Sequence, residues 1–73
     1  MTNATESKHY PPNTKPTLCT PEQMAVDDFV RLGGEFFRVQ DMRAMGGSSS
    51  RVLILEDYGP WVMTGKREIY RPI

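Results

Sequence analysis

Residues 28–39 read DFVRLGGEFFRV, two apolar segments on either side of the pair Gly33-Gly34. Two glycines between β-prone segments favour a two-residue hairpin turn, because both central residues of such a turn need a positive φ. We therefore expect a strand at 28–32 and a second strand that begins at Glu35. The hairpin would give the backbone groups of each segment a hydrogen-bond partner.

A helical alternative exists for the residues before this hairpin. Thr20, Pro21 and Gln23 form a helix-start signal, in which Thr20 is the N-cap and Gln23 completes a capping box. Apolar residues at helical spacing would extend the helix, namely Ala25, Phe29 and Leu32. We favour a single helical turn at 21–25 followed by the strand, because a lone three-turn helix would depend on packing alone.

The rest of the chain contains further strand signals separated by turns. Residues 35–45 indicate a long strand whose side chains change face near Asp41, as they do at a β-bulge. Residues 51–56 hold a continuous apolar centre that is typical of a central strand covered on both faces. Short strands are expected at 61–63 and 68–71, because turn residues lie between these segments.

Five short antiparallel strands at this spacing predict an all-β domain that forms a small barrel around one core. We expect this domain to span residues 21–73. Residues 1–20 hold three of the six prolines and few apolar side chains. They would bury too little apolar surface to offset the entropy cost of ordering, so we expect a disordered N-terminal arm.

The segment AVDDFVRLGGEFFRV at residues 25–39 resembles the opening hairpin of SH3-like β-barrels in small uncharacterised bacterial proteins. That pattern has an apolar-Gly-Asp-x-Val segment, a glycine turn and an aromatic-x-Val strand, and Asp27 stands where the pattern has glycine. Residues 41–44 and 51–53 fit the next hairpin, so the resemblance covers about residues 25–57. It rests on patterning and implies a five-stranded SH3-like barrel. It implies no activity, because such barrels bind peptides, nucleic acids and proteins alike.

Composition and charge argue against several functional classes. Nine basic and nine acidic residues give a formal net charge of zero, so the overall charge does not attract nucleic acid or an anionic membrane. The longest apolar run is far shorter than the roughly 20 residues of a transmembrane helix. The first residues also lack the pattern of a signal peptide. We therefore expect a cytoplasmic protein.

No catalytic or metal-binding pattern is evident in the sequence. His9 and Cys19 are the only histidine and the only cysteine, whereas a thiol nucleophile needs a nearby base and a metal needs several ligands. Adjacent carboxylates on a strand point to opposite faces and are more typical of turns. These acidic pairs are Asp27-Asp28 and Glu56-Asp57. We expect neither enzymatic activity nor a cofactor.

The strongest binding feature is the turn at residues 58–61, which has an aromatic ring on each side. Trp61 would either plug one end of the barrel or line a groove for an extended or proline-rich segment. The leading hypothesis is a non-enzymatic module that binds a protein partner or associates with itself. Its expected binding residues are Tyr58, Trp61, Arg67 and Tyr70. The arm carries a candidate ligand of its own at 10–12, Tyr-Pro-Pro, and docking of this segment within the chain or on a second copy is a further hypothesis.

The alternative hypothesis is a nucleic-acid-binding accessory or regulatory protein. Basic residues interleaved with aromatic residues suit single-stranded nucleic acid, because its bases stack on rings while its phosphates contact cations. The expected contacts are Arg38, Arg43, Arg51, Lys66 and Arg67. Acidic residues in the same strands give a mixed-charge surface, so we favour the protein partner.

Overall fold

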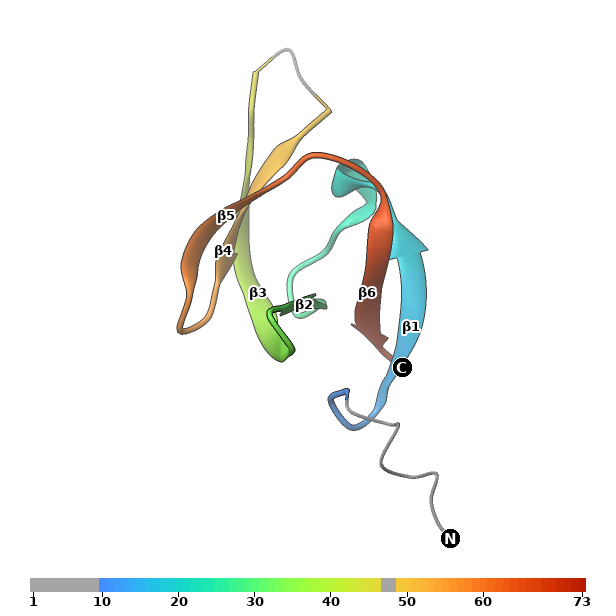
Figure 1. Ribbon diagram of the computed structural model, residues 1–73. Coiled ribbons are helices and arrows are strands. Elements are labelled where there is room, and N and C mark those ends of the chain that lie inside the picture. Colours follow the sequence, from blue (N-terminus) through green and yellow to red (C-terminus); the bar gives the residue numbers. More distant parts are fainter. Residues whose placement is uncertain (1–9, 47–48) are drawn as a thin grey trace, which may run out of the picture.

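Six antiparallel strands form one curved sheet in the order β1-β6-β2-β3-β4-β5 (Figure 1). The computed structural model describes residues 10–46 and 49–73. The strands are β1 (Thr14–Cys19), β2 (Phe29–Leu32), β3 (Glu35–Ala44), β4 (Arg51–Leu55), β5 (Gly59–Met63) and β6 (Arg67–Pro72). A single turn of 3-10 helix, η2 (Pro21–Gln23), lies between β1 and β2. The all-β prediction is therefore confirmed.

The expected hairpin joins β2 to β3 through the two glycines. Gly33 has a φ of 60° and Gly34 a φ of 87°, so both adopt the left-handed conformation that this tight turn needs. Leu32 pairs with Glu35 across the turn. The longer helical alternative is wrong, because the helix between residues 20 and 32 is limited to η2 and the segment from Phe29 is a strand.

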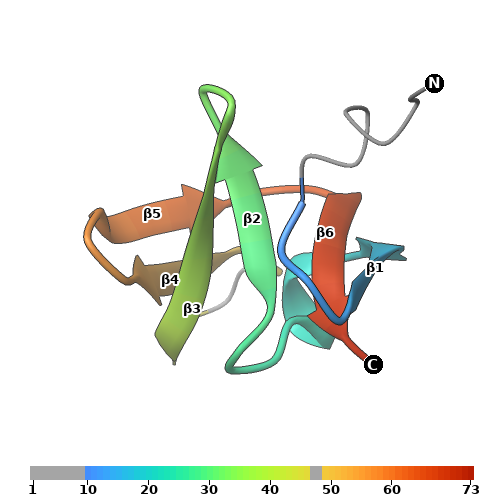
Figure 2. The same ribbon diagram turned by 90° about the horizontal axis from the view of Figure 1, so that it is seen from below.

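Strand β3 bends at the position where its side-chain pattern changes face. Its pairing with β4 shifts between Val39 and Asp41, which confirms the expected bulge and lets one long strand turn from one half of the sheet into the other. Figure 2 shows β1 and β6 at one side, β4 and β5 at the other, and β2 and β3 between them. The bulge therefore gives the sheet the curvature that encloses a core.

The structure corrects the expected boundary at residue 20. Residues Thr14–Cys19 form β1 and pair with β6 along their whole length, from Thr14 opposite Pro72 to Cys19 opposite Arg67. The expected disorder of residues 14–19 and the expected total of five strands are therefore wrong. The composition argument failed because β1 gains its hydrogen bonds and its burial from a strand far along the chain. Residues 1–9, which include His9, lie outside the described residues.

The sheet has two edge strands, β1 and β5. Within the described ranges, no ladder joins the edge strands β1 and β5, so a closed barrel is not confirmed. Each edge strand contains a proline, Pro16 in β1 and Pro60 in β5. Because proline has no backbone N–H to offer, these two residues reduce the tendency of the free edges to pair with other chains.

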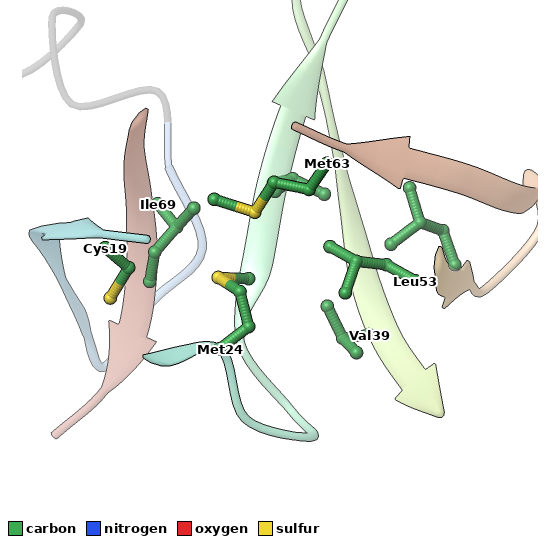
Figure 3. Close-up of a cluster of buried hydrophobic side chains, with 8 residues drawn as sticks. Cys19, Met24, Val39, Leu53, Met63 and Ile69 are labelled. Atoms are coloured by element: carbon green, nitrogen blue, oxygen red, sulfur yellow. The ribbon is translucent and has the colours of Figure 1, made fainter. Parts of the chain in front are cut away.

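The core lies in the concavity of the curved sheet (Figure 3). Leu53 and Leu55 of β4 are buried as expected, whereas Val52 and Ile54 on the other face are half-buried. The central position of β4 is thus correct, but its expected cover on both faces is not. Met24, just after η2, fills the core beside the other buried side chains. These are Cys19, Val30, Val39, Met63 and Ile69.

Candidate partner-binding surface

Of the four residues predicted to bind a partner, the structure brings two together. The Cζ atom of Arg67 lies 5.1 Å from the centroid of the Trp61 ring, a cation–π arrangement. Tyr58 packs instead against Phe37, with 4.9 Å between ring centroids. Tyr70 is buried next to other rings at a different place on β6. The predicted surface is therefore divided into separate contacts.

Trp61 both supports the core and lines a hollow. Its ring packs against the buried cluster, in agreement with the expectation that it covers one end of the core. The same residue borders an open pocket of about 210 Å³ in the bend between β5 and β6. The pocket is lined by Trp61, Val62, Met63, Thr64, Gly65, Lys66 and Arg67. Trp61 is therefore a half-buried residue that packs on the core and also borders an accessible pocket.

Arg67 is held in place by a contact with β2. Its Nη2 atom donates a hydrogen bond to the carbonyl oxygen of Arg31 at 3.2 Å. The guanidinium of Arg31 in turn lies 5.9 Å from the centroid of the Phe36 ring, because these two residues are directly opposite in the β2–β3 hairpin. We call Arg31, Trp61, Lys66 and Arg67 the arginine–tryptophan surface.

The five residues of the nucleic-acid alternative are not equally available. Arg38 makes ion pairs with Asp27 and Glu56, and the hydrogen bond to Glu56, followed by that to Asp27, raises the pKa of Arg38. Arg43 lies 3.8 Å from the carboxylate of Asp41. Arg51 donates a hydrogen bond to the sulfur of Met42 at 3.9 Å. The charges of Arg38 and Arg43 are therefore already matched within the chain.

Three cations of the arginine–tryptophan surface have no such match. Among the residues described, Arg31, Lys66 and Arg67 form no ion pair with a carboxylate. Sequence reasoning overlooked Arg31 and its partner Phe36. The Gly33-Gly34 turn would have placed them opposite each other, since the register follows from a two-residue loop.

A second aromatic cluster covers the outer side of β6. The Tyr70 ring stacks on Tyr10, with 5.1 Å between centroids and 20° between planes, and meets Phe36 edge-on at 5.1 Å. The Tyr70 hydroxyl donates a hydrogen bond to Glu68 at 3.3 Å. Burial is the main cause that raises the pKa of Tyr70, and the neighbouring charge of Glu68 adds to it. We call Tyr70 and Phe36 the tyrosine face.

Comparison with protein-family models, with curated proteins and with solved structures gave no match. Across residues 10–46 and 49–73, histidine, cysteine and carboxylate side chains form no group of three or more that could hold a metal ion. The same residues contain no helix with the length and apolar character that a membrane crossing requires. The case for a function therefore rests on the geometry of the surface.

Proposed function

We propose that the protein is a non-enzymatic interaction module that binds an acidic, extended segment of a protein partner on the arginine–tryptophan surface. The observation that carries the proposal is that Arg67 lies on Trp61, next to Lys66, and forms no ion pair with any carboxylate of the described residues. A guanidinium held on a ring is already oriented for a carboxylate, which it binds through paired hydrogen bonds.

The distribution of charge supports an acidic partner at this place. A carboxylate that approaches Arg38 or Arg43 has to compete with Asp27, Glu56 or Asp41, which are bound there already. At Arg31, Lys66 and Arg67 it competes with no ion pair formed within residues 10–46 and 49–73. Because the net charge of the chain is zero, attraction of the partner depends on this local group of cations rather than on the whole molecule.

The strand order also supports a proposal about the fold, namely that it is an SH3-like barrel with one additional strand. From β2 to β5 each strand pairs with the next, and β6 returns to lie beside β2. We propose that β2–β6 correspond to the five strands of an SH3-like barrel and that β1 is an additional strand outside β6. In this arrangement the pocket lies at the connection between the fourth and fifth of those strands.

Single-stranded nucleic acid is the second candidate, and one observation favours it. Guanidinium groups lie on rings twice in this region, Arg31 on Phe36 and Arg67 on Trp61, and such pairs offer both stacking and charge to a strand of bases. The small number of free cations speaks for a protein partner, because nucleic-acid affinity depends on the number of phosphates contacted.

Binding of two labelled probes, an octaglutamate peptide and an oligothymidylate, separates the candidates. Trp61 is the only tryptophan, so its fluorescence reports on the pocket, and anisotropy of the labelled probe gives an independent signal. We expect saturable peptide binding that Arg67→Gln weakens by about tenfold, equivalent to about 1.4 kcal/mol.

Arg43→Gln is the matched control for this experiment. It removes an exposed arginine that is paired with Asp41 and is not among the residues that line the pocket, and we expect peptide affinity within about twofold of the unmodified protein. Binding of the oligonucleotide without the peptide would assign the surface to the second candidate. If neither probe binds at low salt, the proposed function is wrong.

A further inference from the structure

The tyrosine face already carries a ligand-like segment of the same chain. Tyr10 stacks on Tyr70, and the residues that follow it, Pro11 and Pro12, lead into β1. An aromatic residue followed by two prolines is the kind of extended segment that aromatic surfaces of binding modules take. Figure 2 shows this first described part of the chain beside β6.

A turn folds the segment back onto the sheet. Asn13 has a φ of 62°, and a proline followed by a residue with positive φ is typical of a type II turn. The hydroxyl of Thr14 donates a hydrogen bond to the carbonyl of Pro11 at 2.6 Å, and the Ile73 N–H donates one to the Asn13 carbonyl at 2.9 Å. The turn is anchored at β1 and β6.

The anchoring is uneven along the segment. Thr14 is buried and belongs to the β1–β6 ladder, whereas Tyr10 is only half-buried. Tyr10 contacts the tyrosine face through its ring stack on Tyr70. The ring of Tyr10 is therefore able to leave Tyr70 without loss of the strand pairing that holds β1.

We propose that the tyrosine face is a recognition site for tyrosine–proline segments of a partner protein, and that Tyr10 occupies it in cis as a competitor. This site borders the arginine–tryptophan surface at Arg31, whose guanidinium lies 5.9 Å from the centroid of the Phe36 ring. It takes a different ligand, so it goes beyond the proposed function. The parallel stack of Tyr10 on Tyr70, with Phe36 closing the side edge-on, defines the aromatic ring as the group that is recognised.

If Tyr10 competes for the tyrosine face, the variant without its ring should bind a free tyrosine–proline peptide most tightly. A tethered competitor acts at a high effective concentration, so the unmodified protein binds a free tyrosine–proline segment poorly. Tyr10→Ala removes the competing ring from the full-length chain and leaves Tyr70 and Phe36 in place. Tyr10→Phe keeps the ring and therefore keeps the competition.

The test uses a labelled peptide with the sequence of residues 8–13, Lys-His-Tyr-Pro-Pro-Asn. We expect Y10A to bind it about tenfold more tightly than the unmodified protein or Y10F. A peptide with alanine in place of tyrosine is expected not to bind. In Y10A labelled with 15N, amide shifts are expected around Tyr70 and Phe36, and the additional substitution Arg67→Gln is expected to leave them unchanged.

Two results would overturn the inference. One is equal peptide affinity of Y10A and the unmodified protein. The other is equal binding of the tyrosine and alanine peptides. Y10A is checked for folding by its circular dichroism. If it does not fold, the unmodified protein is titrated with excess peptide, and the absence of shifts at Tyr10 and Tyr70 contradicts the proposal.

Discussion

Arg71 in β6 forms a two-pronged ion pair with Asp28, which lies 43 residues earlier in the chain. Nε donates to Oδ1 at 3.0 Å and Nη2 donates to Oδ2 at 2.8 Å. Asp28 is 1% exposed and also accepts a hydrogen bond from the Ala25 N–H. Arg71 also donates to the Gln23 carbonyl. The pair therefore ties the loop before β2 to β6.

Arg71→Ala is expected to lower the free energy of unfolding by about 3–5 kcal/mol, because it leaves a buried carboxylate without its counter-charge. Arg71→Lys is expected to cost less, since one ammonium retains the charge but cannot make the paired hydrogen bonds. Urea unfolding followed by Trp61 fluorescence measures both. Arg43→Ala serves as the exposed control, and a cost of R71A no larger than that of the control would contradict the role of the pair.

The hairpin turn gives a prediction about backbone conformation alone. Nothing lies within 4 Å of a Cβ built on Gly33 or Gly34, so substitutions there meet no steric obstacle outside the turn. Gly34→Val is expected to cost about 1–2 kcal/mol, because a β-branched residue is strained at a positive φ. Gly33→Asn is expected to stay within about 0.5 kcal/mol of the unmodified protein, since Asn-Gly suits this turn. Thermal unfolding of both variants tests the contrast.

The raised pKa of Tyr70 makes the fold sensitive to alkali. The folded state holds the phenolic proton more tightly than the unfolded state, whose tyrosine titrates near the ordinary value of 10.0. The stabilising contribution is therefore complete below pH 10 and is lost as the pH rises through the folded-state pKa, by at most about 1.4 kcal/mol per pH unit.

Tyr70→Phe isolates this effect, because it keeps the ring but has no proton to lose. Between pH 8 and pH 11, the urea midpoint of the unmodified protein is expected to fall further than that of Y70F. All other titrating groups are common to the two proteins, so the difference reports on Tyr70. Parallel declines in the two midpoints would show that Tyr70 does not contribute.

Pro60 gives a prediction about the free edge of β5. Pro60→Thr adds an N–H to an edge strand, and an unpaired donor there is a site for pairing with another chain. We expect self-association to increase with concentration in sedimentation velocity, while the free energy of unfolding changes by about 1 kcal/mol or less. Val62→Thr is the control, because it changes the same strand without a new donor. Identical sedimentation of P60T and V62T would remove the edge explanation.

The parts of the fold that were predicted correctly have local causes. The glycine pair, the change of side-chain face near Asp41 and the apolar run of β4 each act within a few residues, and each has its structural counterpart. Strand β1 was missed because its partner β6 lies about fifty residues away. Propensity within residues 14–19 carries no information about that partner.

The candidate surface was predicted only in part, because local sequence shows which neighbouring residues meet but not which distant segments return to them. Trp61 and Arg67 lie on either side of a short connection, so their proximity follows from local sequence. Tyr70 was grouped with them, but alternation along β6 turns it to the face opposite the buried Ile69. The orientation of Tyr70 was readable from that alternation, whereas its contact with Tyr10 depends on the return of a distant segment.

The place of β6 between β1 and β2 has a consequence for the order of events during synthesis. A nascent chain that has not yet added residues 67–72 offers β1 no ladder and Asp28 no counter-charge. The earlier strands therefore wait for the segment that joins them, and folding at the ribosome is delayed until that segment emerges from the exit tunnel.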